Sequence, residues 1–126
     1  MKFMSMFESL TGAKLKDCIF DDGLTFVVQE NEIGKAIGKK GSNIKRIESV
    51  FKKKIKLIEF NGDVIKFVSN LIYPAKAKEI IEEEGIITIC THDKKTKGFI
   101  MGRDRHKINT INDIVKRYFE VEVKVE

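Results

Sequence analysis

The stretch that decides the fold is residues 33–44, which read IGKAIGKKGSNI. An apolar pattern with helical spacing runs into the four residues 38–41, GKKG, and a second such pattern leaves them from Ser42. Glycines placed this way interrupt a helix with a tight turn. We therefore predict two helices joined by a glycine loop, with Asn31 capping the first of them.

The loop has the properties of a site for a phosphate-bearing chain. Gly38 and Gly41 lack a Cβ, so another backbone can lie directly on them. Free N–H groups at the start of the following helix, together with its dipole, favour anions there. Lys39 and Lys40 add positive charge. A P-loop is excluded, because only three residues separate Gly34 from Gly38 and no Ser or Thr directly follows the lysine.

The sequence around the loop predicts the rest of a small α+β unit. Its expected elements are a helix over 4–10, strands over 15–20 and 24–29, the two helices that flank the loop, and a strand over 55–60. Asp21, Asp22 and Gly23 form the turn signal of a hairpin between the first two strands.

The second half of the chain repeats this order. A shift of 64 residues takes Gly38 to Gly102 and Ile44 to Ile108. Further elements are expected over 64–72, where Asp63 is the cap, over 86–91, over 97–101, from residue 108, and over 121–125. Residues 75–84 are ambiguous, since local propensity favours a helix but the repeat requires a strand. We predict two domains, 1–61 and 62–126, and their short connection should fix their relative orientation.

Charge is unevenly distributed along the chain. The formal net charge is +5, and residues 34–54 hold eight basic side chains against the single acid Glu48. Residues 94–107 hold six against Asp104, whereas acids gather over 79–84. Clustered basic residues are typical of a face that binds a polyanion, although a solvated lysine-rich surface has the same composition. Without a membrane-length apolar run or a secretion signal, we expect a cytoplasmic protein. We also expect it to be a monomer.

Residues 33–44, with a hairpin before them and a strand after them, resemble the GxxG region of KH domains. The order of elements is similar to the prokaryotic-type (type II) KH fold, and the tandem arrangement resembles the archaeal NusA-like family of transcription elongation and termination factors. The resemblance implies an α+β sandwich of two KH domains, with helices on one face of each sheet. It further implies that the loop clamps about four nucleotides of single-stranded RNA.

The resemblance also indicates which residues contact RNA. They are Gly34, Lys35, Ile37, Gly38, Lys39, Lys40, Gly41, Ser42, Asn43, Lys45, Arg46, Gly102, Arg103, Arg105 and Lys107. In the second loop Arg105 replaces the second glycine, so we expect looser, electrostatic binding there, with a mainly structural second module as the alternative. Ile33, Ile37 and Ile44 should serve mainly as core residues and partly as an apolar groove. No aromatic stacking platform is evident.

Nothing in the sequence indicates catalysis, and we expect neither a cofactor nor a metal. Cys18 and Cys90 lie in apolar runs, and Cys90 with His92 lacks the further donors of a zinc site. The expected partners are single-stranded RNA and, through the resemblance, RNA polymerase or the elongation complex. Two alternatives remain open: a KH protein of ribosomal RNA maturation or ribosome assembly, and a basic scaffold for protein interactions.

Overall fold

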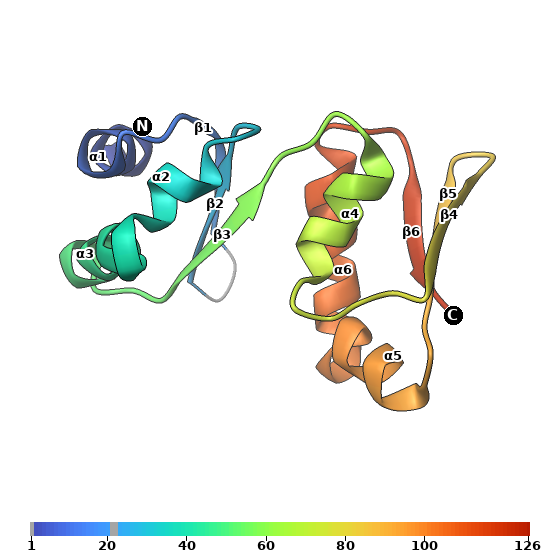
Figure 1. Cartoon of the computed structure of the whole chain (residues 1–126). Coiled ribbons are helices and arrows are strands. Elements are labelled where there is room, and N and C mark those ends of the chain that lie inside the picture. The colour runs from blue at the N-terminus through green and yellow to red at the C-terminus, as the bar shows by residue number, and fades with distance from the viewer. Residues whose placement is uncertain (1, 21–22) are drawn as a thin grey trace. The chain divides into compact units, whose positions relative to one another are not determined.

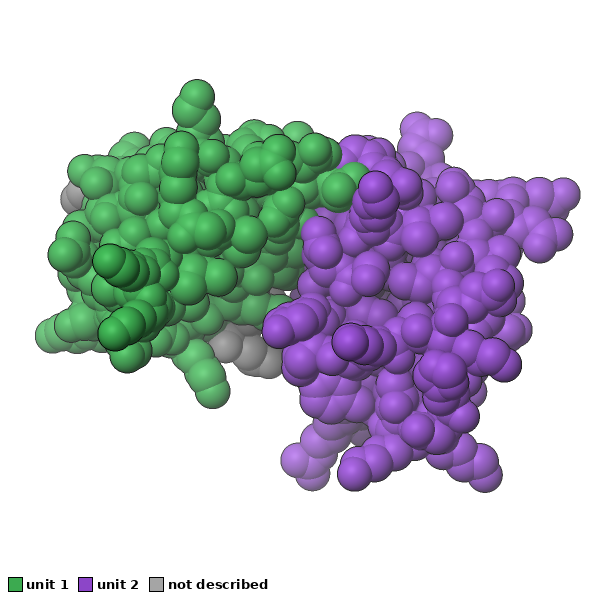
Figure 2. All heavy atoms as spheres, in the orientation of Figure 1, with its two compact units in different colours: residues 1–61 green, residues 62–126 purple. Residues whose placement is uncertain are grey.

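The computed structural model describes residues 2–20 and 23–126, and Figure 1 shows the course of the chain. The chain forms two compact units, residues 1–61 and residues 62–126, which Figure 2 colours separately. Both units have the same order of elements: a helix, a pair of strands, two helices that flank a short 3-10 turn, and a final strand. Among the described residues, no helix is both long and apolar enough to span a bilayer.

In the first unit the glycine loop lies in the connection between two parallel strands. Its elements are α1 (Lys2–Thr11), β1 (Leu15–Phe20), β2 (Leu24–Val28), α2 (Ile33–Ile37), the 3-10 turn η1 (Lys39–Gly41), α3 (Ser42–Phe51) and β3 (Ile55–Glu59). The sheet order is β1-β2-β3, with β2 antiparallel to β1 and parallel to β3. A parallel pair needs a crossover connection. The helices α2 and α3 form that crossover, and the loop is its midpoint.

An aromatic core fixes this crossover on the sheet. The rings of Phe7 and Phe26 have centroids 4.3 Å apart, and Phe51 of α3 lies 6.0 Å from Phe26. Ala36 of α2 and Ile47 of α3 are fully buried in the same cluster. Burial of each large apolar side chain stabilises the fold by about 1.5–3 kcal/mol. The core therefore holds both helices, and with them the loop that joins their ends.

The second unit has the same topology. Its elements are α4 (Val64–Ile72), β4 (Glu79–Glu83), β5 (Ile86–Cys90), α5 (Lys94–Met101), the 3-10 turn η2 (Arg103–Arg105), α6 (His106–Lys116) and β6 (Glu122–Val125). The sheet order is β4-β5-β6, with β5 antiparallel to β4 and parallel to β6. Asn112 joins α6 to β6, since its amide donates to the Val123 carbonyl at 2.8 Å and its oxygen accepts from the Val123 N–H at 2.7 Å.

The strand β4 is an edge of this sheet and carries exposed acids. Glu79, Glu82 and Glu83 are all exposed, and Ile81 between them is 40% exposed. Charged side chains on an edge strand discourage pairing with another chain. The acidic cluster seen in the sequence over 79–84 is therefore a feature of this edge and the turn after it.

The α+β class and most of the predicted elements are confirmed. The hairpin pairs Leu15 through Phe20 with Leu24 through Val28, although Asp21 and Asp22 lie outside the described residues. Asp63 caps α4, accepting a 3.0 Å bond from the Ile65 N–H. Residues 79–83 form a strand, as the repeat required.

One predicted cap is wrong. Asn31 does not cap α2; its φ is 66° and its N–H donates to the Glu59 carboxylate at 3.3 Å. Glu32 stands at the start of the helix instead, and its side chain makes no capping bond there. Asn favours helix N-caps but also adopts left-handed backbone readily, and at position 31 it adopts the left-handed backbone.

Candidate nucleic-acid interface

The first glycine loop makes a sharp turn with an unusual backbone. Gly38 has φ 75° and ψ 174°, a combination open essentially to glycine alone. Its N–H donates to the Gly34 carbonyl at 3.0 Å, and the Gly41 N–H donates to the Gly38 carbonyl at 3.2 Å. Lys40 and Gly41 follow with φ of 55° and 73°. Three residues with positive φ thus turn the chain from α2 into α3.

The two glycines of this loop serve different purposes. A Cβ on Gly38 would lie 2.7 Å from the Asn43 side chain and 2.8 Å from its backbone nitrogen, so Gly38 is required by the fold. A Cβ on Gly41 would meet Ile44 at 3.8 Å, which is ordinary contact, and no other atom of the described residues within 4 Å. The space outside Gly41 is therefore open. Asn43 fastens the turn, because its side-chain amide donates to the Lys35 carbonyl at 2.8 Å.

The cationic side chains of the first loop face solvent. Lys39 and Lys40 are exposed, and so are Lys45 and Arg46 of α3. Within the described part of the chain, no side chain caps the start of α3 at Gly41. The N–H groups of that first helical turn and the positive end of the helix dipole thus lie beside the exposed lysines. This arrangement suits an anion such as a phosphate group.

The remaining predicted residues of the first loop lie near this turn. Gly34 and Lys35 are exposed on α2, and Ser42 is exposed at the start of α3. The prediction that the isoleucines are mainly core residues is wrong for Ile37, which is 40% exposed. Ile33 and Ile44 are half-buried. An apolar surface therefore borders the loop.

The second loop copies the backbone of the first. Gly102 has φ 75° and ψ 171°, and a Cβ there would lie 2.6 Å from the Lys107 side chain. Asp104 and Arg105 have φ of 53° and 63°, close to the values at Lys40 and Gly41. An L-residue held in left-handed backbone costs about 1–2 kcal/mol. The turn is thus kept although Arg105 replaces the second glycine.

The second loop presents arginines and an aromatic ring that the sequence reasoning missed. Arg103, Arg105 and Lys107 are exposed. The Lys107 Nζ lies 3.8 Å from the centroid of the Phe99 ring, a cation–π contact, and Phe99 is 48% exposed. Phe99 directly follows Gly98 in a lysine-rich helix. That context was the available sign that the ring is at the surface.

Two further kinds of site, a metal centre and a reactive thiol at Cys18, gain no support from the described residues. Within residues 2–20 and 23–126, no group of three or more His, Cys, Asp or Glu side chains is arranged to hold a metal. Cys18 is buried, and this burial, followed by the nearby Asp17 carboxylate, raises the pKa of its thiol. A raised pKa leaves less of the reactive thiolate.

Comparisons with known proteins agree with this geometry. A family model described as KH domain matches residues 4–68. "Probable transcription termination protein NusA" of Halococcus morrhuae is 30% identical over 126 residues, covering 97% of this chain and 90% of that protein. The protein of the same name from Methanococcus vannielii is 42% identical over 119 residues, covering 90% and 68%. The crystal structure of APE1850 aligns with a TM-score of 0.78 at 28% identity, covering 99% and 96%.

Proposed function

The chain belongs to the archaeal NusA-like group of KH-domain proteins, and on that premise we propose that it binds single-stranded RNA in transcription elongation or termination. The names of the relatives support the transcriptional role. Acting on a growing transcript would place the protein in the cytoplasm, with RNA polymerase or its elongation complex as a partner. Its activity would be binding rather than catalysis.

The observation that carries the proposal is the open space at Gly41. Arg105 adopts nearly the same backbone in the second loop, so the turn alone does not demand glycine at this position. The described residues of the first unit do not demand it either, because a Cβ would meet only Ile44 among them. The remaining use for a bare backbone is close approach by a ligand.

The proposed mechanism has two parts at the first loop. Phosphates of the strand lie on Gly38 to Gly41, where the N-terminal end of α3 and the side chains of Lys39 and Lys40 meet them. The bases then lie over the apolar surface of Ile33, Ile37 and Ile44. Charge gives affinity without reading sequence, whereas the apolar surface favours unpaired bases that can leave a stack.

We propose further that residues 62–126 are a second KH module with a degenerate loop. The shared order of elements and the shared backbone of residues 102–105 support this assignment. The guanidinium groups of Arg103 and Arg105 are suited to pairing with phosphates. At the equivalent position of the second loop, the side chain of Arg105 takes up the space that Gly41 leaves open in the first loop. The strand would therefore be held less closely by the second loop.

A salt titration tests the proposal. Fluorescence anisotropy of the full chain with a labelled unstructured RNA should show binding whose log affinity falls linearly with log salt. The slope is about −0.7 per phosphate neutralised on a single strand, so a clamp on about four nucleotides gives roughly −3. The same RNA annealed into a duplex is the control and should bind more weakly. Absence of binding to the single strand even at low salt would overturn the proposal.

The RNA that is bound decides the process. Crosslinking in cells followed by sequencing of the attached fragments should recover nascent transcripts, with reads enriched near their 3′ ends. Reads confined to ribosomal RNA precursors would instead assign the protein to ribosome assembly.

A further inference from the structure

The second unit contains a groove that the glycine loop does not explain. Its volume is about 510 Å³, and it lies between the connection from α4 to β4 and one face of α5 with the residues just before that helix. Lys76 lines it from the connection, and Lys95, Thr96 and Phe99 line it from α5. These three positions recur at helical spacing, so one face of α5 forms the wall of the groove.

The ring of Phe99 is the apolar element of this wall. Lys107 from α6 lies over the ring at 3.8 Å from its centroid, yet Lys107 is not among the residues that line the groove. The ring is thus in contact with the cation and also exposed to the groove, with 48% of the residue accessible. An exposed phenyl ring beside a cation is a surface on which a flat aromatic ligand can stack.

The charges around the groove indicate an anionic occupant. Lys76 and Lys95 are exposed lining residues, and Lys107 adds a third positive charge at the ring. The acid among the lining residues, Asp93, caps α5 by accepting a 2.7 Å bond from the Thr96 N–H. That hydrogen bond lowers the pKa of the Asp93 carboxyl. The carboxylate therefore acts mainly within the helix terminus, and the lysines dominate the groove.

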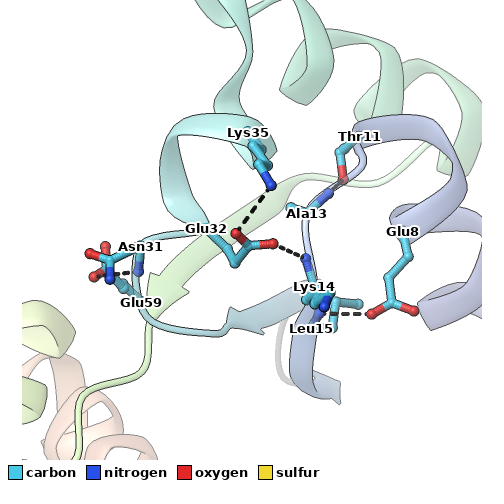
Figure 3. A network of polar contacts seen from close by, with 9 residues as sticks. All are labelled: Glu8, Thr11, Ala13, Lys14, Leu15, Asn31, Glu32, Lys35 and Glu59. Atoms are coloured by element: carbon cyan, nitrogen blue, oxygen red, sulfur yellow. Dashed lines mark hydrogen bonds and ion pairs between the residues drawn. The ribbon is translucent and has the colours of Figure 1, made fainter.

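The corresponding place in the first unit is joined by a polar network, which Figure 3 shows. Glu32 accepts a 2.8 Å bond from the Lys14 N–H, in the connection from α1 to β1, and forms an ion pair with Lys35 at 3.5 Å. The Lys14 N–H, followed by the Lys35 charge, lowers the pKa of the Glu32 carboxyl. Connection and helix are thus tied together directly.

When the two units are aligned by the shift of 64 residues, the key members of this network have different residues at the equivalent positions of the second unit. Thr96 stands where the first unit has Glu32, and Phe99 stands where it has Lys35. The shorter side chain of Thr96 replaces the Glu32 carboxylate, which in the first unit joins the helix to the connection. The ring of Phe99 replaces Lys35, the ion-pair partner of that carboxylate. The substitutions that remove the tie are therefore the ones that leave an open, aromatic-lined groove.

We propose that this groove is an additional nucleobase site, in which one unpaired base of the RNA stacks on Phe99 while Lys76 and Lys95 hold the adjoining phosphates. The site deepens the proposed function and rests on it, since it needs a single strand to be bound. Base–aromatic stacking tolerates any sequence, because every base has a π face. The groove would therefore add affinity rather than sequence preference.

A tryptophan probe tests the stacking directly. The chain has no tryptophan, so Phe99→Trp places a single indole in the groove of the full-length protein. Saturating oligouridine RNA should quench most of its fluorescence. Phe20→Trp is the matched control, because Phe20 is also exposed, at 59%, but lies in the first unit at the end of β1, and its fluorescence should be unaffected. Bound RNA that leaves the Phe99→Trp fluorescence unquenched would overturn the site.

An affinity cycle separates this site from the proposed function. Phe99→Ala should weaken binding of oligouridine about tenfold, a loss typical of one stacked base, and should leave binding of an abasic strand of equal length unchanged. Equal losses on both strands, or no loss on either, would refute base stacking while leaving RNA binding intact. If the unmodified chain binds neither strand, the proposed function itself fails. Circular dichroism of each variant confirms that it is folded.

Discussion

The loops at residues 38–41 and 102–105 have nearly the same backbone but different sequences. Gly38 and Gly102 share φ 75°, and in both a Cβ would lie within 3.0 Å of the residue five positions later. At the fourth position the first loop has Gly41 and the second has Arg105, with φ of 73° and 63°. The first glycine is thus required by the turn on steric grounds, whereas at the fourth position the turn also accepts an L-residue held in left-handed backbone.

The largest effect on stability should follow from substitution of the first glycine, which both loops share. Gly38→Ala places a methyl group 2.8 Å from the Asn43 backbone nitrogen and forces alanine into a backbone region that only glycine favours. We expect it to lower the free energy of unfolding by roughly 2–5 kcal/mol, measured by urea denaturation. Gly34→Ala is the matched control in the same helix, since beyond its chain neighbours and the helix's own backbone the added Cβ would meet no described atom within 4 Å. Similar losses in the two variants would contradict the argument.

Reversal of the loop charge should cost the most RNA affinity. Lys39→Asp combined with Lys40→Asp is expected to weaken binding roughly a hundredfold or more, because two charge-assisted contacts are lost. The melting temperature should stay nearly unchanged, since both side chains are exposed and Asp104 already occupies the position equivalent to Lys40. Lys53→Asp with Lys54→Asp, also exposed, is the control. Undiminished RNA affinity in the loop variant would contradict the proposal that this loop clamps RNA.

Transfer of the arginine into the first loop sharpens the comparison. Gly41→Arg should fold at a cost of about 1–2 kcal/mol, as the second loop does with Arg105. We expect its RNA affinity to fall about tenfold, a moderate loss because the new side chain blocks close approach but adds a positive charge. Gly41→Ala, whose Cβ would contact Ile44, isolates the backbone cost. Anisotropy and urea denaturation are measured on both. Unchanged affinity in the arginine variant would mean that the open space has no ligand.

The reverse transfer should have the smallest effect. Arg105→Gly relieves left-handed strain and opens the second loop, so we expect RNA binding to tighten a few-fold and stability to rise by up to about 1–2 kcal/mol. The gain is limited because a guanidinium that can pair with phosphate is lost. Weaker binding would identify Arg105 as a ligand and show that obstruction is the lesser effect.

The sequence predicted those elements whose burial pattern is regular. Ile47 and Phe51 in α3, and Ile111 and Val115 in α6, are buried as their spacing indicates. Residues 79–83 could not be assigned locally, because their glutamates favour a helix. Pairing with β5 decides for a strand, which is a tertiary effect that a local pattern does not contain.

The candidate site was harder to predict than the fold. The glycines and lysines of the first loop follow from sequence, but the apolar spacing does not reveal that Ile37, the last residue of α2, is exposed. The left-handed backbone of Arg105 goes against the preference of its residue type and is set by the turn around it. The role proposed for Phe99 depends on its contacts with Lys107 and on the connection after α4, which are tertiary neighbours that a local pattern does not show.

The acidic edge strand β4 has a consequence for how the molecule meets its partner. Glu79, Glu82 and Glu83 are exposed on the same unit as Arg103 and Arg105, so negative charge gathers at its edge strand and positive charge at its loop, as in a dipole. In the field of a polyanion such a dipole experiences a torque that swings the carboxylates outward. Encounters would then begin with the loop leading, and this bias should fade as added salt shortens the range of the field.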